Sequence, residues 1–188
     1  MNRMCVWMVA AVALVGLNAS RADAQGGGTY KGLLTVQLGA TSGGDVPATS
    51  LTPGASVSVH ETTGWGAELD FGFANGSPSP GPELDLATYM VNIMWLAQSG
   101  IVRPYGVGGV GGIQVHGCFA ACPKIATVYD LGVNVGGGAI YEVNDIVGVR
   151  GDVRYFMAPG DKTGFTRPGN YGFWRLSAGV TFTWVIAP

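Results

Sequence analysis

The sequence predicts an all-β protein, an eight-stranded antiparallel up-and-down transmembrane β-barrel, and three observations lead to that fold. Apolar and polar residues alternate in eight segments, which is the period of a β-strand because successive side chains point to opposite faces. Aromatic residues stand at the ends of the apolar faces, where a strand would meet lipid headgroups. The connections alternate between long and short along the chain, as expected for a barrel whose two rims differ.

The clearest alternation lies in residues 128–156, which read as two strands joined by a polar turn. Odd positions from Tyr129 to Tyr141 and from Val147 to Tyr155 carry no charge, whereas even positions hold charged residues separated by glycines. In a soluble protein the charged face would meet water, but here tyrosines edge the apolar face at both ends. This arrangement favours lipid outside the wall and a polar lumen inside it.

Residue parity constrains the turn of this hairpin. The two odd rows share one face only if paired residue numbers sum to an even number, which favours a three-residue loop at 143–145. Tyr141 would then lie opposite Val147, and Gly138 would lie opposite Arg150. A glycine opposite a long basic side chain leaves room for it inside a narrow tube.

The same alternation defines the remaining strands. The eight predicted strands are 29–40, 55–60, 65–73, 85–96, 102–116, 128–142, 146–156 and 173–185. The segment 102–116 is the hardest to orient because it is rich in glycine and both of its faces are small. Its favoured register has four residues outward, namely Tyr105, Val107, Ile113 and Val115.

The predicted connections alternate strictly, beginning with a long one. The long connections are 41–54, 74–83, 117–124 and 157–171, and the short ones are 61–64, 97–101 and 143–145. Glycine, serine, threonine and proline are frequent in the long connections, and such residues punctuate strands. An even number of strands places the start of the first strand and the end of the last at the rim of the short turns.

The first 24 residues have the layout of a secretory signal peptide. A basic residue, Arg3, precedes the apolar run Met4 to Leu17, and Ala22-Asp23-Ala24 forms a small-x-small cleavage site. Cleavage after Ala24 would leave one barrel domain at 25–188. Beyond the signal no segment has about 20 consecutive apolar residues, so a membrane-spanning form of this chain must cross with strands.

Charge and cysteine usage exclude several classes of partner. The chain has 10 Lys and Arg against 12 Asp and Glu and no basic run, so nucleic acid is not an expected partner. Cys118 and Cys122 form a C-x3-C pair, which in an exported protein indicates a small loop-closing disulfide. Zinc is the competing interpretation, but His116 does not complete a ligand set. No metal and no cofactor is predicted.

At the level of pattern the sequence resembles the small eight-stranded outer-membrane β-barrel proteins, including the OmpX-like and OmpA-barrel-like domains of the porin family. The segments that carry the resemblance are Arg103–Gly108, Leu131–Gly138, Val149–Phe156 and the closing strand 173–185. It covers essentially all of residues 29–185. The resemblance implies export to the outer membrane of a Gram-negative-type envelope and says little about a specific function.

The inward-facing charges form the principal candidate site. They are Lys31, Glu68, Asp70, Asp130, Arg150, Asp152, Arg154 and Arg175. Eight strands enclose an interior just wide enough for side chains to fill, so these charges are expected to pair across the lumen, because isolated buried ions are too costly. They would form a structural plug, or a gate if the pairs exchange partners.

The outward aromatic residues are predicted to mark the two lipid interfaces. They are Tyr30, Trp65, Trp95, Tyr141, Tyr155, Trp174 and Trp184. Membrane lipids are therefore the expected surroundings of a monomeric barrel. The long loops are the surface that an extracellular ligand could reach, but their composition does not identify one.

Catalysis is not predicted. His60 and His116 are the histidines of the chain, and the predicted register separates them to opposite ends. Ser56 and Ser58 lie near His60 in sequence, but inward positions on one strand are an ordinary consequence of alternation.

The favoured interpretation is an outer-membrane barrel with a polar, largely plugged lumen and a structural or surface-interaction role. The alternatives are a narrow passive channel for ions or small solutes and, less favoured, a soluble lipocalin-like barrel that binds an apolar ligand.

Overall fold

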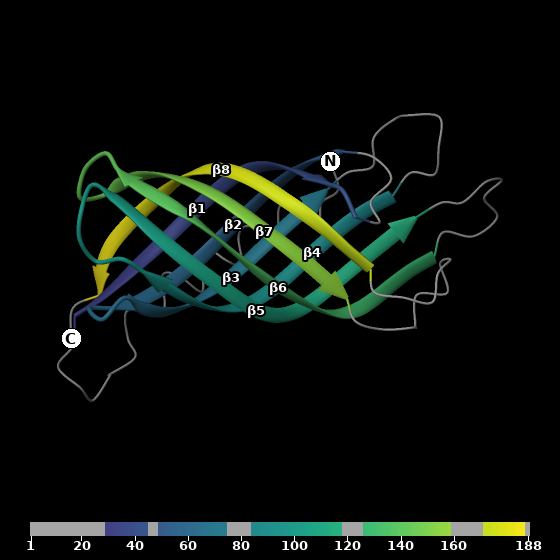
Figure 1. Cartoon of the computed structure of the whole chain (residues 1–188), viewed down its shortest axis with the longest axis horizontal. Helices are drawn as coiled ribbons and strands as arrows, with labels where there is room; N and C mark the ends of the chain where they lie inside the picture. The colour runs from purple at the N-terminus through teal and green to yellow at the C-terminus, as the bar shows by residue number, and fades with distance from the viewer. Residues whose placement is uncertain (1–28, 45–48, 75–83, 118–125, 159–170, 187–188) are drawn as a thin grey trace.

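The computed structural model describes residues 29–44, 49–74, 84–117, 126–158 and 171–186, and within these ranges the chain forms a closed antiparallel barrel. The strands are β1 (Tyr30–Ser42), β2 (Ser50–Glu61), β3 (Trp65–Ala74), β4 (Leu84–Leu96), β5 (Val102–Gly117), β6 (Ala126–Glu142), β7 (Val147–Ala158) and β8 (Tyr171–Ile186). Each strand pairs with the next in sequence, and they run obliquely around the tube (Figure 1). The predicted eight-stranded up-and-down barrel is confirmed.

Pairing of the first and last strands closes the barrel. β1 pairs with β8 from Tyr30 opposite Ile186 to Ser42 opposite Trp174. Closure satisfies the backbone hydrogen bonds that an open sheet would leave unpaired at its edges, which is a condition for a sheet in hydrocarbon. The beginning of β1 and the end of β8 lie at the same end as the short turns (Figure 1).

The short turns lie where the sequence indicates them. Gly64 and Gly100 have positive φ values of 91° and 94°, a conformation that glycine adopts without strain. In the β6–β7 turn, the Asn144 side-chain oxygen accepts hydrogen bonds from the backbone N–H groups of Ile146 (2.9 Å) and Val147 (2.8 Å). An asparagine that binds the backbone two or three residues ahead stabilises such a turn.

This turn also changes the predicted hairpin register. The loop spans 143–146, and Tyr141 lies opposite Val149 rather than Val147. The parity argument is right, because the paired numbers still sum to an even value, but the register differs by two residues. Gly138 therefore faces Asp152 instead of Arg150. Five residues, 143–147, separate the last pair, Glu142 and Gly148, instead of the predicted three, which accounts for the shift by two.

The first long connection is shorter than predicted. Residues 41–54 were expected to form a loop, yet β1 extends to Ser42 and β2 begins at Ser50. The inward side chains of Thr41 and Thr52 share a hydrogen bond of 2.7 Å, and the lumen accepts threonine and serine where a soluble core would not. Composition typical of a loop is therefore compatible with a strand here.

The predicted facing of β5 is wrong. Tyr105, Val107, Ile113 and Val115 are buried in the lumen, whereas the alternate positions, including Val110, face outward. The reason is Arg103, which lies two positions before Tyr105 and therefore on the same face of the strand. The predicted facing would have turned the Arg103 guanidinium toward lipid. In the structure Arg103 is buried and pairs with Glu142 near the short-turn rim.

The outer wall is apolar and the lumen is mostly polar over the described residues. Leu131, Ile93 and Leu176 are 73%, 66% and 65% exposed on the outside, whereas Glu68, Arg150 and Arg154 are at most 1% exposed inside. None of the described segments forms a helix long and apolar enough to span a bilayer.

Candidate functional site: the barrel lumen

Three strands supply a cluster of charged side chains in the lumen, which we call the ionic layer. Its members are Glu68 and Asp70 on β3, Arg150, Asp152 and Arg154 on β7, and Arg175 on β8. Each is at most 4% exposed. On β3 and β7 the charged residues are spaced two positions apart, and β8 contributes a single one. Because side chains two positions apart on a strand share a face, those of β3 all point inward together, and so do those of β7.

Arg154 is the centre of the ionic layer. Its guanidinium lies 2.9 Å from Glu68, 2.8 Å from Asp152 and 3.6 Å from Asp70. Two of these carboxylates come from β3 and one from Arg154's own strand, β7. The side chain therefore reaches across the lumen and ties two well-separated strands together.

The other two arginines complete the charge balance. Arg150 lies 2.8 Å from Glu68 and 3.3 Å from Asp152, and Arg175 lies 2.6 Å from Asp70. Three guanidinium groups thus meet three carboxylates. A balanced set avoids an isolated buried ion, whose desolvation is not compensated.

Two charges that were predicted to join the lumen network lie apart from it. Lys31 is exposed at the start of β1, and Asp130 is half-buried near the start of β6. Among the described residues neither has an ion pair within 4.0 Å. Both occupy strand ends, where a side chain can stay hydrated, so facing alone does not place a charge in the layer.

Neutral polar side chains extend the ionic layer, and the sequence argument did not assign them a role. Asn92 donates a hydrogen bond to Glu68 (3.0 Å), Asn134 donates to Asn92 (2.7 Å), and Gln37 donates to Asp70 (3.1 Å). Strand alternation alone predicted that Gln37 and Asn92 face the lumen. The carboxylate that each of them contacts depends on how far along the barrel axis its strand places it.

Tyr105 also contacts the ionic layer, a contact that was missed from the sequence because this face of β5 was predicted to point outward. Its hydroxyl donates a hydrogen bond to Asp152 and accepts one from Arg150 Nε at 2.8 Å. The Arg150 guanidinium also lies over the Tyr105 ring, 4.4 Å from its centroid, a geometry that favours a cation. The signal that could have found it was Arg103, two positions earlier on the same strand.

Apolar side chains fill the lumen on both sides of the ionic layer. Toward the long connections, the long-loop apolar layer consists of Ala74, Leu86, Met90, Ile113, Val115, Phe156, Ala158 and Phe173. Toward the short turns, the short-turn apolar layer consists of Leu33, Met94, Leu96, Tyr105, Val107 and Ile140. The lumen is therefore less uniformly polar than the sequence indicated.

Aromatic packing closes the long-loop apolar layer. The rings of Phe156 and Phe173 stack with centroids 5.0 Å apart and planes 5° from parallel. The guanidinium of Arg175 lies 4.8 Å from the centroid of Phe156. The ionic layer thus contacts its apolar neighbour directly.

A serine and a histidine meet at the short-turn end of the lumen. His60 Nε2 lies 2.9 Å from Ser58 Oγ, and both side chains are 2% exposed. His60 Nδ1 has no hydrogen-bond partner in the described part of the chain. In the described ranges no acid lies within hydrogen-bond distance of His60 Nδ1, the position of the orienting group in a nucleophile–base arrangement.

His116, Cys118 and Cys122 are the remaining residues that were considered as metal ligands or disulfide partners. His116 pairs with Asp85 and Thr127 in the sheet register. Cys118, Cys122 and the signal segment 1–24 lie outside the described residues. Across the described ranges no group of three or more His, Cys, Asp or Glu residues is placed to hold a metal ion.

The predicted interface aromatics stand toward the two ends of the outer wall. Tyr30, Trp65, Trp95, Tyr141 and Trp184 lie near the short-turn rim. Tyr155 and Trp174 lie toward the long connections, with ring centroids 4.9 Å apart. Trp65, Tyr141 and Trp174 are 58%, 52% and 52% exposed.

Comparison with known proteins identifies the fold. No protein family and no curated protein matches the sequence. Solved structures do match: Neisserial surface protein A has a TM-score of 0.64 at 15% identity, over 81% of this chain and 96% of that one. The N-terminal β-barrel domain of Pseudomonas aeruginosa OprF has a TM-score of 0.60 at 14% identity, over 84% and 99%.

A third match comes from another genus. A major outer membrane protein of Thermus thermophilus has a TM-score of 0.54 at 14% identity, over 82% of this chain and 99% of that one. At these identities the likeness concerns the fold alone. The chain has the fold of the small eight-stranded outer-membrane barrels, as the sequence predicted.

Proposed function

We propose that this chain is an integral outer-membrane barrel whose lumen is sealed, with a structural role or a surface-interaction role at its long connections. The short turns, the start of β1 and the end of β8 face the periplasm in this proposal, and the long connections face outward. Residues 1–24 act as the export signal. Membrane lipids surround a monomeric barrel.

The observation that carries the proposal is the three-layer filling of the lumen. Hydrated ions can be accommodated near charged groups, but an apolar constriction excludes them because water leaves it. Here Phe156 and Phe173 pack on one side of the ionic layer, and Met94 and Leu96 on the other, all with 0% exposure. An ion would have to cross both apolar layers as well as the charges.

The distribution of side chains argues against a soluble lipocalin-like barrel. That alternative requires an apolar interior and a polar exterior. The described residues show the opposite, with buried arginines and carboxylates inside and exposed leucine, valine and isoleucine outside. A wall of this kind is stable in hydrocarbon rather than in water.

Planar-bilayer recording of the refolded full chain tests the seal. We expect no defined single-channel steps from the wild-type barrel, and none from Lys31→Ala, a matched variant whose side chain lies outside the layers. Heat-modifiable gel mobility shows that each barrel has folded. Defined steps in the wild type that disappear or change size in Glu68→Ala would contradict a sealed lumen.

A narrow ion channel is the second candidate, and one feature favours it. Arg154 has three carboxylates within 4 Å, so it could exchange partners without leaving a charge unpaired. Such exchange would require a water path through both apolar layers. Cation-selective steps whose selectivity falls in Glu68→Gln would support this candidate over the sealed barrel.

We propose no enzymatic activity. The support is the environment of Ser58 and His60, which are buried and have no acid at His60 Nδ1 in the described part of the chain. Any partner of the protein would therefore meet the long connections or the outer wall.

A further inference from the structure

The glycines of the barrel fall into two groups that differ in what a side chain would meet. A methyl group on Gly136 would lie 2.7 Å from Arg154 Cγ, and one on Gly109 would lie 2.7 Å from Asn92 Cα. Packing against neighbouring residues explains these glycines. A methyl group on Gly106, Gly112 or Gly151 would meet nothing within 4 Å, and one on Gly108 would meet only a backbone oxygen at 3.6 Å.

The second group therefore has no explanation in the barrel's own packing. Three of its members, Gly106, Gly108 and Gly112, occupy the outward face of β5, opposite in facing to the buried Tyr105 and Val107, whereas Gly151 is a single outward glycine on β7. Glycine weakens a strand interior, and in strands it often marks a place where another molecule approaches the backbone. Because large apolar side chains such as Ile93 and Trp95 stand on the neighbouring strand, the bare backbone of β5 leaves a depression in the wall.

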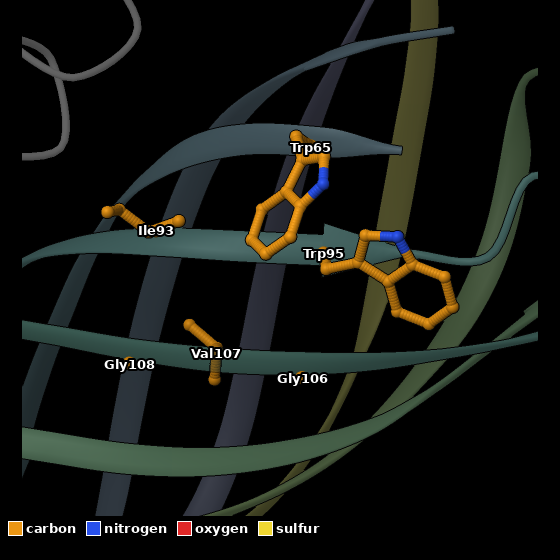
Figure 2. A pocket seen from close by; sticks show the side chains of 6 residues that line it. All are labelled: Trp65, Ile93, Trp95, Gly106, Val107 and Gly108. Carbon is orange, nitrogen blue, oxygen red and sulfur yellow. The ribbon is translucent and has the colours of Figure 1, made fainter. Parts of the chain in front are cut away.

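Part of this depression is a groove with aromatic walls. Its volume is about 360 Å³, and it is lined by Trp65, Ile93, Trp95, Gly106, Val107 and Gly108. Trp95 lies directly opposite Gly106, and Ile93 directly opposite Gly108, on the neighbouring strands. Figure 2 shows the two indoles and Ile93 beside the bare backbone of the glycines.

The groove lies at a defined height in the wall. Trp65 is the first residue of β3 and pairs with Trp95, next to the last residue of β4. Tryptophan at a strand end positions its ring where headgroups meet hydrocarbon. The glycine floor continues from Gly106 to Gly108 away from the rim and toward the middle of the wall.

We propose that this groove binds one acyl chain of a glycerophospholipid from the leaflet at the short-turn rim. The floor presents glycine backbone, the walls are apolar side chains, and the indoles stand at the level of the headgroup. The volume is near the lower end of the range of about 300–1,000 Å³ for small-molecule pockets, which suits a single chain rather than a whole lipid.

The shape favours a lipid chain over a second copy of the barrel. The groove is open toward the bilayer, and Trp65 (58% exposed), Ile93 (66%) and Trp95 (44%) project beside its glycine floor. A second barrel presents a rigid convex wall, which would contact the projecting side chains before reaching the floor. A flexible acyl chain can lie between them and cover the glycine backbone.

Filling the floor with a side chain tests the proposal. Gly106→Leu and Gly108→Leu place a branched side chain in the groove, and Gly112→Leu is the matched control, because it lies on the same face of the same strand outside the groove. Each refolded full-length barrel is inserted into vesicles of phosphatidylethanolamine and phosphatidylglycerol, extracted in mild detergent and weighed by native mass spectrometry.

We expect wild type and Gly112→Leu to retain one phospholipid per barrel. In Gly106→Leu and Gly108→Leu the retained amount should fall about tenfold, which corresponds to losing the burial of about two methylenes. Equal retention in all four proteins, or no retained phospholipid in the wild type, would overturn the proposal. A barrel dimer that the two groove variants abolish would show that a second copy occupies the groove instead.

The inference rests on the membrane location in the proposed function, and the two fail in different ways. A chain that does not insert into the vesicles would refute both. A barrel that inserts, shows heat-modifiable mobility and retains no phospholipid would refute the groove alone.

Discussion

The ionic layer and the apolar layers on either side of it both pack the interior of the barrel, but by different physics. In the apolar layers each side chain contributes burial, and the loss of one leaves a cavity whose cost depends on how its neighbours relax. In the ionic layer, each arginine neutralises buried carboxylates that cannot reach water. Removing one arginine therefore leaves a buried negative charge without a partner. The comparison teaches that tolerance to mutation should differ by layer, although burial is nearly complete in both.

The largest effect is expected at the centre of the ionic layer. Arg154→Ala leaves Glu68, Asp70 and Asp152 with two guanidinium groups, so the free energy of unfolding should fall by about 3–5 kcal/mol, as for other broken buried pairs. Urea titration in detergent micelles, followed by heat-modifiable mobility, measures it. A loss below about 1 kcal/mol, typical of exposed pairs, would mean that the layer is hydrated.

An intermediate effect is expected in the short-turn apolar layer. Met94 is 0% exposed and lies opposite Gly66 and Val107. Met94→Ala removes buried methylenes without stranding a charge, so a loss of about 2–4 kcal/mol is expected. The same titration gives this value, and a loss larger than that of Arg154→Ala would reverse the proposed ranking of the layers.

The smallest effect is expected at Lys31, a charge on the inward face of its strand that lies outside the ionic layer and outside the two apolar layers. Lys31 is exposed at the start of β1, so Lys31→Ala should change the free energy of unfolding by no more than about 0.5 kcal/mol, as surface substitutions usually do. A large loss in the urea titration would indicate that Lys31 belongs to a network in the membrane-inserted barrel.

Strand alternation encodes which face of the wall a side chain occupies, so the sequence could predict which residues point into the lumen. On β7, the spacing of Arg150, Asp152 and Arg154 was enough to place all three on the inner face, and Glu68 and Asp70 on β3 followed the same rule. On β5, glycine erased the contrast between faces, and the facing of Tyr105 was predicted the wrong way round. Burial of Arg103 supplies the missing constraint.

Partners across the lumen could not be predicted in the same way. Glu68 meets Arg150 and Arg154 because β3 and β7 stand on different sides of the tube at matching heights. That height depends on the stagger accumulated around the barrel, and each turn contributes to it. The β6–β7 turn has two more residues between its last paired positions than predicted, and this shifted the pairing by two positions.

The sequence by itself determined the strands, their number and, for seven of them, which side chains face lipid, because a period of two is a local property of an extended backbone. Only the tertiary structure decided which charges pair, that apolar layers bound them, and that bare glycines on β5 lie beside the tryptophans of β3 and β4. Those features depend on register and curvature, which are set when the barrel closes and strands distant in sequence come to the same height.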